Sequence, residues 1–240
     1  MTRTNFQEVT VTQPRLAAFD LDNTLLGGDS DHLWGRFLVD HGIVDAQAYE
    51  RENDRFYRQY QTGTLDIGEF LAFALRPLAE HHPDTLAQWR ERFIDERIRP
   101  IVLEAARSLV ERHRRAGDRL LIITATNRFV TEPIAELFDI RELLATEPER
   151  DERGYTGRHV GVPTFREGKI HALEDWLART GMSLEESTFY SDSHNDLPLL
   201  RRVTHPVAVD PDERLDSEAR RLGWPRLSLR QGPHPTILPA

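Results

Sequence analysis

The sequence contains no cysteine, and this absence excludes several kinds of chemistry. Without a thiol, the chain cannot form disulfides, use a thiolate nucleophile, or bind zinc or an iron–sulfur cluster through cysteine. Because cysteine-based sites are excluded, a site built on carboxylates becomes the more plausible kind. The sequence also lacks any apolar run near the ~20 residues that span a bilayer, and its polar first residues lack the apolar core of a signal peptide. We therefore expect a cytoplasmic protein with no membrane partner.

Basic residues are scarce relative to acidic ones. The 31 Lys and Arg residues stand against 40 Asp and Glu residues, which gives a formal net charge of -9. Because nucleic-acid binding needs clustered basic side chains along the phosphates, we expect no nucleic-acid partner. None of the 10 histidines has ligand spacing such as HExxH, so we expect no histidine metal site.

Three short apolar segments each end in a polar turn, and this repeated pattern predicts a parallel sheet. Residues 15–19 end in DLDNT, residues 119–123 in TATN and residues 187–190 in SDSHND, and each turn precedes a stretch with helical spacing. A fourth short strand is expected at residues 206–210. The fold class predicted is α/β, a doubly wound parallel sheet, which binds ligands beyond the carboxyl ends of its strands.

A helical insertion is expected between the first two strands. Residues 30–97 have no strand-like alternation and carry aromatic and aliphatic residues at helical intervals. A chain of 240 residues is long enough for one domain that carries a smaller inserted one. We therefore expect a core formed by residues 1–29 and 98–240, with residues 30–97 as a helical cap.

Two further segments are assigned no function. Residues 145–165 have the pattern of a small structural hairpin whose turn uses Gly154. The proline-rich end, residues 223–240, is expected to be irregular.

Asp20 and Asp22 place two carboxylates two residues apart at a strand end, where alternate side chains face the same way. Two like charges so close are costly unless a cation lies between them, and an all-oxygen site suits Mg²⁺. If DLDNT stood alone, a solvated acidic turn would be the simpler interpretation.

Three later segments supply side chains that change this interpretation. They are IITAT with Thr124, EGKI with Lys169, and SDSHND with Asp192 and Asp196. With DLDNT they resemble, in order, the four motifs of the haloacid dehalogenase-like superfamily, and the resemblance covers about residues 15–210. A lone lysine at a helix start would otherwise be a solvated side chain.

The resemblance implies a role for each acidic residue. Asp20 would attack phosphorus to form an aspartyl-phosphate, which splits one difficult displacement into two easier ones. Asp22 would act as general acid and then as general base. The carboxylates of Asp20 and Asp192 and the backbone carbonyl of Asp22 would hold Mg²⁺.

The resemblance also implies how the phosphate is held. Thr124, Lys169 and Asn195 are the expected phosphate-binding residues, since phosphoryl transfer depends on positioning and on compensating charge. Asp196, with Asn195, would orient Lys169, a metal-bound water or the phosphate from a second layer.

An insertion directly after the first motif resembles the subgroup that contains phosphoserine phosphatases and bacterial histidinol-phosphate phosphatases. Asp29 falls where phosphoserine phosphatases carry an acidic residue that pairs with the substrate ammonium. The cap arginine that those enzymes use for the substrate carboxylate would fall at Ala72. Because phosphoserine would then leave a carboxylate unpaired, histidinol phosphate is the expected substrate and phosphoserine the alternative.

Side chains of the insertion could modify this expectation. Arg76, one helical turn beyond that alanine, could replace the missing arginine. Trp34, Phe56, Tyr57 and Phe73 could pack an imidazole, although ordinary core packing within the insertion is the simpler explanation for each of them.

Other activities use similar residues. A phospho-acceptor signalling domain also combines an aspartate, magnesium, a hydroxyl and a lysine on a doubly wound sheet, but it does not need the acid and base provided by Asp22. A dehalogenase would leave that residue no task, because halide departs without protonation. A phosphotransferase or mutase could use the same residues as a phosphatase, and this alternative stays open.

Overall fold

The computed structural model of the chain describes residues 14–239. These residues form an eight-stranded sheet with the order β4-β3-β2-β1-β5-β6-β7-β8. The strands are β1 (Leu16–Phe19), β2 (Arg119–Asn127), β3 (Glu142–Asp151), β4 (Gly154–Val160), β5 (Thr188–Ser191), β6 (His205–Val209), β7 (Arg226–Ser228) and β8 (Thr236–Ile237). The six central strands are parallel, and only the edge strands β4 and β8 pair antiparallel with their neighbours. The predicted α/β fold is confirmed.

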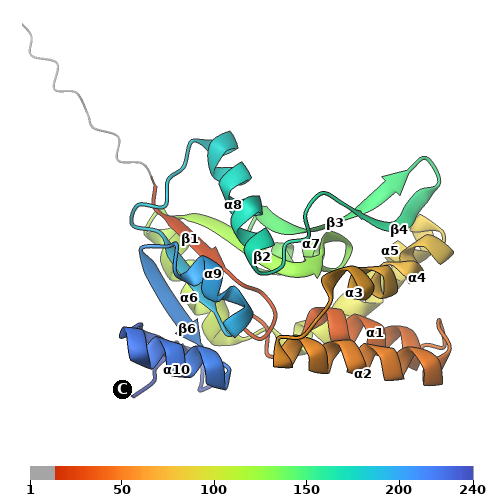
Figure 1. Cartoon of the computed structure of the whole chain (residues 1–240), viewed down its shortest axis with the longest axis horizontal. Coiled ribbons are helices and arrows are strands. Elements are labelled where there is room, and N and C mark those ends of the chain that lie inside the picture. The colour runs from red at the N-terminus through yellow and green to blue at the C-terminus, as the bar shows by residue number, and fades with distance from the viewer. Residues whose placement is uncertain (1–13, 240) are drawn as a thin grey trace, which may run out of the picture.

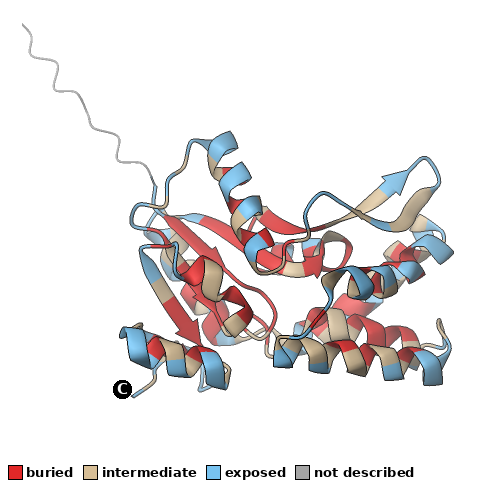
Figure 2. Ribbon diagram, viewed as in Figure 1, coloured by how far each residue is buried: buried red, intermediate tan, exposed pale blue. Residues whose placement is uncertain are grey.

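Alternate residues of the central strands face two separate hydrophobic clusters. Ala17 and Phe19 pack with the helices on one face, whereas Leu16 and Ala18 pack with those on the other. The first face is covered by α6 (Glu104–Arg115) and α7 (Arg128–Leu137), and the second by α8 (Glu167–Thr180), α9 (Leu197–Leu200) and α10 (Glu213–Leu222). Figure 2 shows the buried residues concentrated on the strands and on the helix sides that face them.

Residues 30–97 are helical, and they lie on one side of the sheet in Figure 1. Their helices are α1 (Ser30–Asp40), α2 (Ala46–Thr62), α3 (Ile67–Ala74), α4 (Arg76–Glu80) and α5 (Pro83–Phe93), followed by a π-helical turn at Ile94–Ile98. Aspartate caps begin the first three, because Asp29, Asp45 and Asp66 each accept a hydrogen bond from a backbone N–H of the first turn. The chain segments that enter and leave this insertion lie side by side, since the Gly27 N–H donates to the Ile101 carbonyl at 2.7 Å.

Two expectations need correction. The proline-rich end is not wholly irregular, because β7 extends the sheet beside β6 and β8 returns along it. The segment TATN is not a turn, since β2 continues to Asn127, which pairs with Thr146 of β3. The TATN segment is polar, and the C-terminal segment is interrupted by Gly and Pro. Neither sequence therefore shows the alternation of apolar and polar residues that is typical of half-buried strands.

The hairpin is present, as β3 and β4, with Gly154 at the start of its second strand. Its first strand also pairs in parallel with β2, so it belongs to the main sheet as well. The part of the predicted core that precedes residue 14 lies outside the described residues. Within residues 14–239, no helix is both long and apolar enough to cross a bilayer.

Candidate active site

Strand β1 delivers Asp20 and Asp22 to the carboxyl edge of the sheet, where both are buried. The Asp20 N–H still donates to Tyr190 of β5 at 2.9 Å, so the chain leaves the sheet only after the first carboxylate. The Asp22 carboxylate accepts a hydrogen bond from the backbone N–H of Ser30, at 2.7 Å, and another from the Thr126 hydroxyl, at 2.8 Å. The start of α1 and the end of β2 therefore fix its orientation.

Lys169 joins two of the predicted carboxylates. Its Nζ lies 2.7 Å from Asp20 Oδ1 and 2.7 Å from Asp196 Oδ2, and its side chain is only 2% exposed. The Ser191 hydroxyl donates to the same Asp196 oxygen at 2.7 Å. Lys169 is the only lysine in the whole chain, and it lies in this site.

A close backbone approach sets the position of this lysine at the start of α8. A Cβ added at Gly168 would lie 1.9 Å from the Pro163 carbonyl oxygen, so only glycine fits immediately before Lys169. The loop before α8 can therefore bring the lysine amine under β1.

Burial sets the protonation of the acidic residues. Burial and the nearby Asp29 charge raise the pKa of Asp22 to about 6, although hydrogen bonds from Ser30 and Thr126 oppose this rise. Burial raises the pKa of Asp20 to about 7, although the Lys169 charge lowers it. Burial alone would favour a neutral lysine, but the charges of Asp196 and Asp20 outweigh it and raise the pKa of Lys169. The lysine therefore stays charged.

The Thr24 hydroxyl lies between the carboxylates of Asp20 and Asp192. Its Oγ1 lies 3.1 Å from Asp20 Oδ2 and 3.1 Å from Asp192 Oδ1, and it accepts a hydrogen bond from the Asp192 N–H at 3.1 Å. Burial and the Asp20 charge raise the pKa of Asp192 well above its ordinary value. A hard divalent cation between these oxygens would relieve the repulsion. Sequence reasoning missed Thr24, although it is the last residue of DLDNT.

The predicted metal ligands include only two carboxylates, with a backbone carbonyl as the third ligand. In residues 14–239, no group of three His, Cys, Asp or Glu side chains is arranged to hold a metal ion. The set of Asp20, Asp192 and the Asp22 carbonyl therefore stays a prediction.

Thr124 faces the Asp22 carboxylate. Its Oγ1 lies 3.4 Å from Asp22 Oδ2 and accepts a hydrogen bond from the Thr126 N–H at 3.2 Å. The sequence analysis missed Thr126. Its position two residues after Thr124 on β2 predicts that the two side chains point to the same side of the sheet.

Asn195 is engaged differently from the phosphate contact predicted for it. Its Nδ2 donates to the Tyr60 carbonyl of α2 at 3.2 Å, and its Oδ1 accepts from Arg166 Nε at 3.0 Å. In this structure it links the core to the insertion. His194 Nδ1 lies 2.7 Å from Asp212 Oδ2, beside the site rather than in it.

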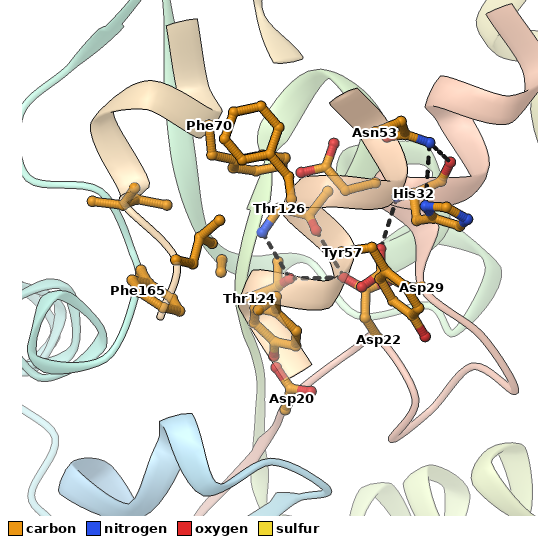
Figure 3. A pocket seen from close by; sticks show the side chains of 16 residues that line it. Asp20, Asp22, Asp29, His32, Asn53, Tyr57, Phe70, Thr124, Thr126 and Phe165 are labelled. Carbon is orange, nitrogen blue, oxygen red and sulfur yellow. Dashed lines mark hydrogen bonds between the residues drawn. The ribbon is translucent and has the colours of Figure 1, made fainter. Parts of the chain in front are cut away.

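A pocket lies directly over Asp20 and Asp22, as Figure 3 shows. Its aromatic wall comes from the insertion and from the loop before α8, with Phe56, Tyr57, Phe70 and Phe165. Its polar lining includes Asp29, Asp31, His32 and Asn53. Asp29 caps α1 by accepting a hydrogen bond from the His32 N–H at 2.8 Å, and burial raises its pKa.

The expectation that Ala72 occupies the place of a substrate-binding arginine is wrong, because this residue is on the side of α3 that faces away from the pocket. Ile67 and Phe70 line the pocket, whereas Ala72 is exposed on the opposite side of the helix. Arg76 is also outside the pocket lining: its side chain is 57% exposed and pairs with Glu80 at 3.7 Å. It therefore does not replace the missing arginine.

Two of the four aromatic residues predicted to pack a ring do not reach the pocket. Trp34 is buried against Phe37 and Phe93, and Phe73 packs on Tyr49. Trp34 and Phe73 belong to the core of the insertion, so of the four predicted residues Phe56 and Tyr57 line the pocket.

The arrangement of these side chains agrees with a known family, whose description is haloacid dehalogenase-like hydrolase and whose model matches residues 17–201. The chain belongs to this family. The match runs from β1 to the end of α9, and it therefore contains every predicted site residue.

Several relatives of the chain carry phosphatase names. Histidinol-phosphatase of Neisseria meningitidis serogroup C (strain 8013) is 47% identical over 219 residues, which cover 90% of this chain and 99% of that protein. Phosphoserine phosphatase SerB1 of Mycobacterium tuberculosis (strain ATCC 25618 / H37Rv) is 33% identical over 211 residues, which cover 87% of this chain and 68% of that protein.

Solved structures of similar proteins share the fold. A protein with unknown function from Bordetella pertussis Tohama I has a TM-score of 0.86 at 44% identity, over 91% of this chain and all (100%) of that chain. A phosphoserine phosphatase solved as an analogue of its phospho-aspartyl intermediate has a TM-score of 0.66 at 17% identity, over 86% and 91% of the two chains.

Proposed function

We propose that the protein is a magnesium-dependent phosphatase of small phosphate monoesters and that Asp20 is its nucleophile. The contact that carries this proposal is the one between Asp20 and Lys169, because a buried, charged amine favours the ionised form of one carboxylate directly beneath a pocket. In the first step an Asp20 oxygen bonds to phosphorus while the bond to the ester oxygen breaks. Water then cleaves the aspartyl-phosphate and releases inorganic phosphate.

Asp22 is assigned the proton transfers. It contacts Ser30, Thr124 and Thr126 but no basic side chain among the described residues, and its pKa of about 6 keeps a proton accessible near neutral pH. It would protonate the departing alkoxide and then accept a proton from the attacking water. Thr124 and Lys169 would hold the phosphoryl oxygens, while Asp196 keeps the lysine in place.

The donor set beside Asp20 fits Mg²⁺. Its members, Asp20, Asp192 and the Asp22 carbonyl, are all oxygens, and Thr24 holds the two carboxylates. Bound there, the ion would compensate the charge of the phosphoryl oxygens. Residues 30–97 would act as the cap over a core formed by residues 1–29 and 98–240, since their side chains supply most of the pocket wall.

The proposed substrate is histidinol phosphate. Within the described chain, the pocket lining includes Asp29 but no arginine or lysine, which suits an amine without a carboxylate. The 47% identical relative named histidinol-phosphatase supports the same choice. Phosphoserine is the second candidate, favoured by the relative named phosphoserine phosphatase. A phospho-acceptor signalling domain is disfavoured by the buried acid Asp22.

The test is a turnover screen with Mg²⁺ over histidinol phosphate, phosphoserine, sugar phosphates, nucleotides and p-nitrophenyl phosphate. We expect kcat/KM for histidinol phosphate to exceed that for phosphoserine by at least about tenfold, the effect of one charge-assisted contact. Asp20→Asn, an almost isosteric change, should abolish turnover without lowering the melting temperature. Phosphoserine turned over equally well would refute the substrate, and activity retained in Asp20→Asn would refute the nucleophile.

A further inference from the structure

The pocket contains a second carboxylate whose function is unassigned, Asp31. It lies two residues after Asp29 in the first turn of α1, and both line the pocket. Burial and the charges of Asp29 and Asp22 raise the pKa of Asp31 well above its ordinary value. No side chain in residues 14–239 gives it a hydrogen bond or an ion pair. Its charge therefore has no compensating group in the protein.

Among the described residues that line the pocket, the one basic side chain, His32, already has other partners. His32 Nδ1 lies 3.2 Å from Asn53 Nδ2, and His32 Nε2 lies 3.8 Å from Asp54. Burial lowers the pKa of His32, and its ring stacks on Tyr57 at 4.6 Å. Both ring nitrogens thus face residues other than Asp31.

The remaining carboxylates near the pocket each have a partner of another kind. Asp20 and Asp196 share Lys169, and Asp22 holds two hydroxyls and a backbone N–H. Of the carboxylates in the described lining, Asp29 and Asp31 have neither a positive partner nor a side-chain hydrogen-bond donor. A ligand that fills the pocket would therefore bring two positive groups, because two half-buried carboxylates without compensation are costly once a ligand excludes water from them.

The two acids differ in their partners. Asp29 accepts a hydrogen bond from the His32 N–H at 2.8 Å, and it falls where the resemblance places the acidic residue that pairs with a substrate ammonium. Asp31 is the other carboxylate that α1 presents to the pocket. In histidinol phosphate the ammonium is close to the phosphate and the imidazole is further along the carbon chain. With Asp29 assigned to the ammonium, Asp31 is the carboxylate left for the ring.

We infer that Asp31 is the specificity residue that binds a ring nitrogen of the imidazole, while Asp29 binds the ammonium. This inference rests on the proposed function. A carboxylate favours the imidazolium form and forms a charge-assisted hydrogen bond with its N–H. The aromatic side chains Phe56 and Phe70 line the same pocket and can pack against the faces of the ring.

The experiment compares two esters that differ only in the ring. Histidinol phosphate is measured beside phenylalaninol phosphate, which keeps the amine and the phosphate and replaces the imidazole with a phenyl group. In Asp31→Asn, the ratio of kcat/KM for histidinol phosphate to that for phenylalaninol phosphate should fall about tenfold to a hundredfold, the size of a charge-assisted hydrogen bond. In Asp29→Asn both values should fall, with the ratio nearly unchanged.

Asp84→Asn is the matched control. Asp84 is the second residue of α5, as Asp31 is the second residue of α1, but its side chain is 87% exposed and lies outside the pocket. The Asp84→Asn variant measures how far the loss of a carboxylate from the first turn of a helix affects stability and activity by itself. This control should leave the ratio unchanged, and melting temperatures should show that all three variants fold.

The outcomes separate the inference from the proposed function. Efficient turnover of histidinol phosphate by the wild type, with the ratio unchanged in Asp31→Asn, would overturn only the role of Asp31. Equal losses for both esters in Asp31→Asn would also overturn it, because the residue would then serve the helix or the ammonium. A wild type that prefers phenylalaninol phosphate or phosphoserine would refute the proposed substrate and the inference together.

Discussion

Asp20 and Asp22 are two residues apart and both buried, but their neighbours give them different chemistry. Lys169 contacts Asp20 at 2.7 Å and favours its ionised form. Asp22 has hydroxyl and N–H donors instead, and burial leaves its pKa at about 6. Burial raises the pKa of Asp20 to about 7 in spite of the lysine, so a cation bound beside Asp20 would have to complete the separation of the two roles.

Asp22→Asn should therefore affect esters according to their leaving groups. With p-nitrophenyl phosphate the leaving group hardly needs a proton, so aspartyl-phosphate should still form, whereas formation from an alkyl phosphate should fall by about 100-fold or more. Rapid-mixing measurements of the first turnover would separate this step from hydrolysis of the intermediate. Equal losses for the two esters would contradict the assignment of Asp22 as general acid.

Motif residues of the site could be predicted from the sequence, but residues set by side-chain direction could not. Asp20, Lys169 and Asp196 meet as expected because parallel strands end at one edge of the sheet. Ala72 was placed wrongly, since its facing depends on where α3 begins. Asp31 was missed because an acidic residue in the first turn of a helix is common and has a structural explanation.

At the scale of elements, the end of α2 is the main polar link between the insertion and the core. Three of its last carbonyls accept hydrogen bonds from core side chains: Tyr60 from Asn195, Thr62 from Arg214, and Gly63 from Arg166. Carbonyls at a helix C-terminus carry partial negative charge and lack partners within the helix, so the two guanidinium groups suit them.

Gly63→Ala tests this link, with Gly181→Ala as control. Both glycines end a helix in the left-handed conformation, at φ 72° and 69°, so both changes should cost about 1 kcal/mol of stability. A Cβ at Gly63 would lie 2.7 Å from His194 Nε2, whereas one at Gly181 meets nothing within 4 Å. Only Gly63→Ala should lower kcat/KM for histidinol phosphate. A similar loss in both variants would indicate a general effect of stability.

The strands predicted from the sequence are those with apolar residues on both faces of the sheet. Buried runs such as LAAF and RLLII identified β1 and β2, because a parallel sheet covered by helices needs no polar face. Strand β7 has three residues and includes a buried arginine, Arg226, paired with Asp216. Such a pair forms only after the chain has folded, so no local pattern predicts it.

At the scale of the whole molecule, the sheet separates two hydrophobic clusters, and acidic groups gather at its carboxyl edge. The cluster on the α6 and α7 side continues into the insertion through Trp34, Phe37 and Phe93. The insertion is therefore packed on the core by apolar contacts as well as by the end of α2. Burying these contacts stabilises the molecule, whereas the nearby carboxylates Asp20 and Asp192 destabilise it unless a cation binds.

Mg²⁺ binding and folding should therefore be linked through Asp192. A ligand at about 100 times its Kd contributes about 2.7 kcal/mol, so saturating Mg²⁺ should raise the melting temperature of the wild type by about 5 to 10 °C above that in EDTA.

The effect of Asp192→Asn on the melting temperature should have opposite signs in EDTA and in Mg²⁺. In EDTA the substitution removes a buried carboxylate that the Asp20 charge repels, and this unfavourable environment is what raises the pKa of Asp192. The melting temperature of the variant should therefore equal or exceed that of the wild type. In Mg²⁺ it lacks a ligand, so it should melt below the wild type and need more metal for activity. A variant that loses equal stability in both conditions would show that Asp192 supports the fold through Thr24 alone and does not bind the metal.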